Sequence, residues 1–234
     1  MKGKMKSKQT STHATKLHPV FRMNETEKDI WNKMLKYDDA YFSDMRIEKK
    51  ELIRRFGRLQ FEEENGTWRT VYDDFPLWNQ IPRLENWIIK IVNEKKMKAG
   101  GICVGERKTI KIAEGLNRNE LKQILLHEMI HAYEDLHIKG KGYEVYRQFF
   151  LLYFFGKLKN KIGLEALNEI IENGLQFILL EDLHTPLFLL KSLDLDLRLK
   201  KPWGTIHSYR RADYFEQIQY KAKKKEEGKK EKRG

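Results

Sequence analysis

The stretch that decides the fold is LLHEMIHAY, residues 125–133. Before it, Asn117 and Glu120 have the spacing of a capping box, which predicts that a helix begins there. The residues from 121 to 132 are apolar on nearly every side of such a helix, and a helix of that kind is buried. A buried helix that carries two histidines and a glutamate is therefore the starting point for both fold and function.

The two histidines have the spacing of metal ligands. His127 and His131 are four positions apart, which places both imidazoles on one face of a helix, one turn apart. At this spacing, two imidazole nitrogens can bind one zinc ion at about 2.0–2.1 Å. Glu128 adjoins the first ligand, where it can act as general base toward a zinc-activated water. The pattern predicts Zn²⁺ as cofactor, although two hydrogen-bonded core histidines and a surface glutamate are the alternative.

Catalytic zinc usually keeps three protein ligands, and His137 is the preferred candidate for the third. It follows His127 by ten positions. On a continuous helix it would point about 120° away from His131 and miss the metal. The prediction therefore requires the helix to end near Asp135.

Two other residues are alternative candidates for the third ligand. Glu144 would begin the next helix and return a carboxylate to the site, whereas His184 would need a long-range approach. Glu134 lies on the motif face, three residues beyond His131. It can accept a hydrogen bond from a ligand imidazole, and a solvated side chain without a role in the site is the alternative.

The rest of the chain predicts an α+β fold without internal repeats. Asn65-Gly66 lies between two strand-like runs and predicts a β-hairpin. Gly100-Gly101 is expected to end a preceding helix. Helices are expected at residues 24–41, 48–59, 84–98, 143–158 and 164–180, and short strands at 102–104 and 109–112. We therefore expect a small β-sheet packed on the buried motif helix, with additional helices toward the C-terminus.

The strands at 101–103 and 109–112, followed by the segment at 125–133, resemble the core of the SprT-like (Spartan-type) metalloproteases. The match covers about residues 100–133, and its specific part is the HExxH helix with its preceding strand. The resemblance implies a zincin-like fold, zinc, proteolysis and DNA-bound proteins as the substrate class. The chain departs from the family after the motif helix, where Lys141 stands in place of a histidine ligand before Gly142.

The positive charge of the chain is concentrated at its two ends. Residues 1–22 carry six basic residues and no acid, and residues 221–234 carry eight basic residues and three acids. The remaining body has 32 basic and 31 acidic residues, which accounts for only +1 of the net +12. We predict a disordered basic arm at 1–22, a metallopeptidase domain with a helical extension at 23–220, and a disordered basic tail at 221–234. Such ends can bind nucleic acid through counterion release, and solubilising tails with no dedicated partner are the alternative.

The sequence thus predicts a zinc metallopeptidase that acts on proteins or peptides, including DNA-associated proteins. The single cysteine, Cys103, excludes an intrachain disulfide and favours an intracellular protein, either cytoplasmic or nuclear/nucleoid-associated. No apolar run reaches the roughly 20 residues of a membrane span, so no membrane partner is expected. A non-catalytic zincin scaffold that binds nucleic acid or protein is the alternative, favoured by Lys141.

Overall fold

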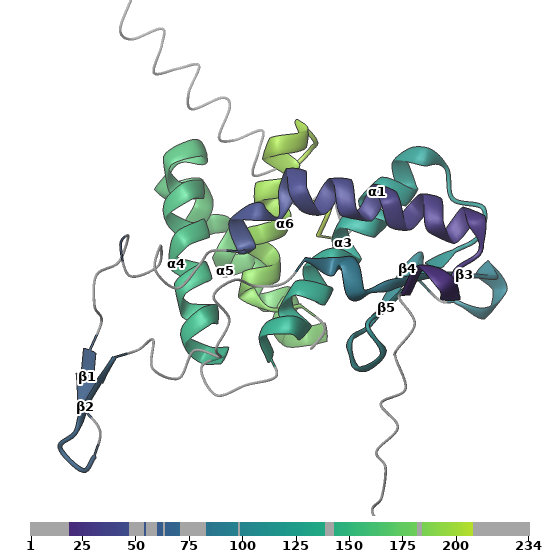
Figure 1. Cartoon of the computed structure of the whole chain (residues 1–234). Helices are drawn as coiled ribbons and strands as arrows, with labels where there is room; N and C mark the ends of the chain where they lie inside the picture. The colour runs from purple at the N-terminus through teal and green to yellow at the C-terminus, as the bar shows by residue number, and fades with distance from the viewer. Residues whose placement is uncertain are drawn as a thin grey trace, which may run out of the picture.

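The computed structural model describes residues 19–46, 54, 60–62, 64–70, 83–97, 99–138, 143–181 and 184–207. Within them the fold is α+β, with a three-stranded mixed sheet, a two-stranded hairpin and five α-helices (Figure 1). The helices are α1 (Glu25–Tyr41), α3 (Arg118–Ile138), α4 (Tyr143–Ile162), α5 (Leu164–Glu181) and α6 (Pro186–Leu199). The strands are β1 (Gln60–Glu62), β2 (Trp68–Thr70), β3 (Ile88–Val92), β4 (Gly101–Val104) and β5 (Thr109–Ala113).

Local sequence signals set the starts of two helices and the turn of the hairpin. The Asn24 side chain accepts from the backbone of Glu27, and the Glu27 carboxylate accepts from the backbone of Asn24. Asn117 and Glu120 form the same reciprocal pair at the start of α3. These bonds satisfy backbone N–H groups that lack partners within the helix. In the hairpin, Gly66 has a φ of 78°, a conformation that favours glycine. The three predictions are confirmed.

The predicted helix at residues 84–98 is wrong. Leu84–Asn86 forms one 3-10 turn, and Ile88–Val92 forms β3, which pairs in parallel with β5. A short apolar run does not distinguish a buried strand from a buried helix by periodicity, and four of these five residues are β-branched, which favours a strand. Gly101 accordingly begins β4 and caps no helix.

The motif helix α3 lies between the sheet and the C-terminal helices. Strands β4 and β5 pack against α3, and β4 pairs antiparallel with β5 at the edge of the order β3-β5-β4. Helix α6 packs against α3 from the other direction and also against α4 and α5 (Figure 1). Six residues of α3 are buried to 0% exposure: Leu125, Leu126, Met129, Ile130, Ala132 and Tyr133. The helix is therefore part of the core, as its all-round apolar character predicts.

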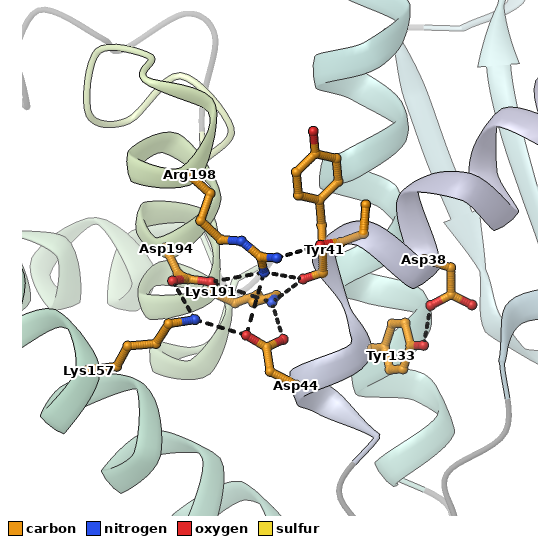
Figure 2. Close-up of polar contacts among 9 residues, drawn as sticks. Asp38, Tyr41, Asp44, Tyr133, Lys157, Lys191, Asp194 and Arg198 are labelled. Atoms are coloured by element: carbon orange, nitrogen blue, oxygen red, sulfur yellow. Dashed lines mark hydrogen bonds and ion pairs between the residues drawn. The ribbon is translucent and has the colours of Figure 1, made fainter.

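A buried network of charged groups holds α6 in place (Figure 2). Lys191 of α6, which is completely buried, donates to Asp44 at 2.8 Å and lies 3.7 Å from Asp194. Lys157 of α4 contacts Asp44 at 3.0 Å and Asp194 at 2.8 Å. Arg198 lies 3.6 Å from Asp44 and 3.7 Å from Asp194. Burial alone would raise the pKa of Asp44, but Lys191 and Lys157 hold it below its ordinary value.

The network has three cations but only two carboxylates. The carbonyl groups at the C-terminal end of α1 supply the remaining negative charge. The backbone carbonyl of Tyr41 accepts from Lys191 at 2.7 Å and from Arg198 at 2.9 Å, and Arg198 also donates to the carbonyl of Ala40. The last carbonyls of a helix carry partial negative charge, so they favour cations. Three cations, two carboxylates and one helix end thereby join α1, α4 and α6 (Figure 2).

Several predictions fall outside the described residues. They include most of the helix at 48–59, the tail at 221–234 and most of the arm at 1–22. The described structure begins inside the predicted arm, where Pro19–Arg22 forms a 3-10 turn and the Arg22 carbonyl accepts from Lys90 at 2.6 Å. None of the helices in the described part of the chain combines the length and apolar character that a membrane span needs.

Candidate metal centre

Three histidines from two distant segments meet at the site. His127 and His131 come from α3, and His184 lies immediately before α6. One ring nitrogen from each lies within 4.8 Å of the others. The Nε2 atoms of His127 and His184 are 3.3 Å apart. Two nitrogens bound to one zinc ion at about 2.0–2.1 Å with tetrahedral angles are about 3.3–3.4 Å apart, so this pair already has the spacing of two ligands.

The tautomer of His127 directs a lone pair toward His184. Its Nδ1 lies 2.8 Å from the carbonyl oxygen of Ile206. Because a carbonyl oxygen can only accept, Nδ1 carries the proton and Nε2 keeps its lone pair. Metal-binding histidines commonly donate their other N–H to a carbonyl or carboxylate in this way.

The carbonyl that orients His127 is itself fixed by a buried carboxylate. Asp196 of α6 accepts from the backbone N–H of Gly204 at 2.8 Å and of Ile206 at 3.0 Å. These bonds hold the turn at residues 203–207 against α6. The sequence analysis did not identify this support, because the residues involved lie about 80 positions from His127 in the chain.

Phe188, which is completely buried, forms the apolar floor of the cluster. Its ring centroid lies 4.7 Å from that of His127, 4.5 Å from His131 and 4.2 Å from His184. One rigid ring therefore contacts all three imidazoles, which limits the rotamers that they can adopt.

All three imidazoles favour their neutral forms. Burial lowers the pKa of His131 to about 3, with further lowering by His127, His184 and His207. Burial and His127 lower the pKa of His184 to about 4. Burial also lowers the pKa of His127, against the opposing hydrogen bond to Ile206. A histidine must be neutral to bind a metal, so the cluster is ready to act as a donor set.

Glu128 lies against the edge strand of the sheet. Its side chain is 5% exposed, and burial raises its pKa to about 8, although a backbone hydrogen bond from Cys103 opposes the rise. A Cβ atom at Gly101 would lie only 2.7 Å from the Glu128 carboxylate, so β4 approaches this side chain as closely as glycine permits. The alternative without a metal placed Glu128 on the surface. Because the side chain is buried, that part of the alternative is wrong.

Glu134 supports the segment that carries His184. Its carboxylate accepts from the hydroxyl of Thr185, which also caps α6 by accepting from the backbone of Phe188 at 3.1 Å. Glu134 lies 3.9 Å from Nδ1 of His131, too far for a hydrogen bond, and its 5% exposure also contradicts the alternative of a solvated side chain. Burial raises its pKa to about 7, while the bond from Thr185 opposes the rise.

The third histidine that the described residues bring to the cluster is His184, whereas His137 was the preferred candidate from the sequence. Helix α3 continues to Ile138, so the helix end that His137 required near Asp135 is missing. On the continuous helix, position 137 is about 120° around the axis from His131. The side chains of His137 and Glu144 lie outside the described residues.

A local signal marks the position of His184. Thr185 and Pro186 form the N-cap and first-turn pattern of α6, for which the sequence analysis had made no prediction. Recognising that helix would have placed a histidine at its start. Three neutral imidazoles with this nitrogen spacing suit zinc in their donor chemistry. Comparison of the chain with protein families, curated proteins and solved structures found no match.

Proposed function

We propose that the chain is a zinc-dependent metallopeptidase with a zincin-like site, in which His127, His131 and His184 bind the metal. The observation that carries the proposal is the cluster of these three imidazoles, whose nitrogens lie within 4.8 Å of one another beside a buried glutamate. The HExxH spacing supplies two of the three donors, and the Thr185-capped start of α6 supports the third.

Zinc in such a site supplies a water of lowered pKa and polarises a carbonyl for hydrolysis. In our proposal Glu128 would be the general base of the hydrolysis and would return the proton it takes up to the leaving amine. Glu128 neighbours His127 in sequence, and its contact with β4 fixes where the carboxylate lies. Among the described residues, Glu128 does not belong to the group of donors that lie within 4.8 Å of one another, so the proposal makes it a base and not a fourth ligand.

The substrate class in the proposal is protein, including protein bound to nucleic acid. The basic ends of the chain, at +6 and +5, support the second part. Lys141 favoured a non-catalytic scaffold because it left the site without a third ligand. His184 removes that argument, since it offers an imidazole at ligand spacing from His127.

Metal analysis of purified variants tests the donor set. We expect about one zinc per wild-type chain, and loss of that zinc in His184→Ala because two donors hold the metal poorly. The matched control is His137→Ala, which should keep its zinc. Full zinc in His184→Ala, or loss of zinc in His137→Ala, would contradict the assignment.

Replacement of the base tests the chemistry. Glu128→Gln keeps the size of the side chain but cannot take a proton, so zinc content should stay near wild type while proteolysis falls by about 10²–10⁴-fold or more. The measurement is cleavage of labelled casein, and of labelled Glu128→Gln chain mixed with wild type, followed by mass spectrometry. Glu120→Gln on the same helix is the control and should cleave normally. Equal cleavage by Glu128→Gln and wild type would exclude this site as the source of activity.

A further inference from the structure

A fourth histidine adjoins the cluster without joining the donor set. His207 follows the Ile206 carbonyl that orients His127. Its ring centroid lies 4.9 Å from that of His184 and 5.8 Å from that of Phe188. The residue is 7% exposed, and both ring nitrogens are shielded from solvent. A buried imidazole thus lies against one of the metal-binding residues.

The geometry separates His207 from the ligands. Among the described residues, the histidines whose nitrogens all lie within 4.8 Å of one another are His127, His131 and His184 alone. His207 is nevertheless close enough to His131 to contribute to its lowered pKa. A group beside three donors, but outside their set, is placed to contact what those donors hold.

The location of His207 is set by the fold. The turn at residues 203–207 is held by Asp196 through the backbone N–H groups of Gly204 and Ile206. The ring of His207 is additionally packed against Phe188 and His184. A donor that is fixed in advance loses little freedom when a ligand arrives, and it acts more strongly in a dry site than in water.

We propose that His207 donates an imidazole N–H hydrogen bond to an oxygen of the group that occupies the open position of the metal. The ligand class is an oxygen-bearing anion, or the peptide carbonyl oxygen that gains negative charge when it is attacked. A neutral imidazole has one N–H to donate, so this role needs no change of protonation. The inference rests on the proposed metal site but does not need peptide hydrolysis to be its reaction.

The test is binding of acetohydroxamate, a small oxygen-donor anion, to the zinc-loaded full chain by calorimetry. His207→Phe keeps an aromatic ring for packing but removes both nitrogens. We expect it to retain about one zinc per chain and to bind acetohydroxamate about 10- to 100-fold more weakly, as loss of a hydrogen bond to a charged group predicts. His207→Gln, which keeps an N–H donor, should recover part of the affinity, and His137→Ala should bind like wild type.

The alternatives give different results. Unchanged acetohydroxamate affinity in His207→Phe would show that His207 makes no contact with the bound group. Loss of zinc from both His207→Phe and His207→Gln would make His207 a ligand, and absence of zinc from the wild type would remove the site on which the inference rests. Where His207→Phe does not fold, equal affinity of His207→Gln and His207→Ala overturns the inference. Binding involves no turnover. The inference can therefore hold even where wild type and Glu128→Gln cleave equally and this site is not the source of proteolysis.

Discussion

Gly101 tests how closely β4 must approach Glu128. A Cβ atom there would lie 2.6 Å from Ile124 Cγ2 and 2.7 Å from both Cγ and Oε1 of Glu128. We expect Gly101→Ala to cost about 1–3 kcal/mol of the free energy of unfolding, which is typical of overpacking. It should also lower proteolysis by displacing the carboxylate, while zinc stays bound. Urea unfolding, metal analysis and casein cleavage measure the three effects.

Gly156 provides the opposite case. It lies within α4, and a Cβ atom added there would meet no atom within 4 Å. Alanine has a higher helix propensity than glycine, so Gly156→Ala should raise the free energy of unfolding by about 0.5–1 kcal/mol. Equal effects of the two glycine substitutions would show that the contact between β4 and Glu128 is not tight.

At the residue scale, the site was predictable where its members are close in sequence. His127 and His131 could be paired from the helical period alone, and Glu128 followed from its place between them. His184 lies 57 positions from His127, and no periodicity links residues across that distance. His184 was one of three candidates for the third ligand, because a sequence does not show which loop folds back onto the motif helix.

At the element scale, the buried charge network should be the most sensitive contact of α6. Asp44→Asn leaves the fully buried Lys191 with one carboxylate fewer. Breaking a buried pair from one side leaves an uncompensated charge, so we expect a loss of about 3–5 kcal/mol in the free energy of unfolding. Chemical denaturation of the variant measures this loss.

The control for that variant is Asp39→Asn. Asp39 pairs with Arg46 and Arg83, but its side chain is 57% exposed, so its loss should change stability by less than about 1 kcal/mol.

The pH dependence of stability gives a second check on the role of Asp44. The pKa of Asp44 is lowered from 3.8, so its contribution is complete above that pH and is lost as the pH falls through the lower folded value. A deficit in Asp44→Asn that did not shrink as the pH fell below 3.8 would contradict this account.

The elements that were predicted correctly begin with clear local signals, whereas β3 and α6 were missed although each carries a weaker one. Capping boxes mark the starts of α1 and α3. By contrast, β3 has apolar residues on both of its faces, so periodicity does not separate a strand from a helix there, and its β-branched residues are the local signal for a strand. Helix α6 carries a buried lysine and two buried aspartates, which obscure its apolar face. These charges are acceptable only because α1, α4 and the turn at residues 203–207 supply partners for them.

At the scale of the whole molecule, zinc should stabilise the fold. Its proposed ligands belong to α3 and to the segment before α6, so the bound ion would join two parts of the chain that meet only in the folded state. Free zinc at 100 times its dissociation constant adds about 2.7 kcal/mol. For a chain of this size we therefore expect chelation to lower Tm by about 5–10 °C. Differential scanning calorimetry with and without a chelator measures the shift.

His184→Ala is the variant that identifies the cause of this shift. Its Tm should be nearly the same with and without the chelator, because it has lost the donor that joins the two segments. His137→Ala should show the full wild-type shift. A chelator effect of equal size in all three proteins would indicate that zinc stabilises the fold from another place.

The hydrogen bond between His127 and the carbonyl of Ile206 joins residues 79 positions apart. A ribosome makes a chain from its N-terminus, at about 5–20 residues per second. The two histidines of α3 are therefore made several seconds before the turn that orients one of them. During that interval a growing chain has the HExxH helix but not the finished centre. The proposed metal centre would therefore take its final geometry only after residue 206 has been made, several seconds after its motif helix.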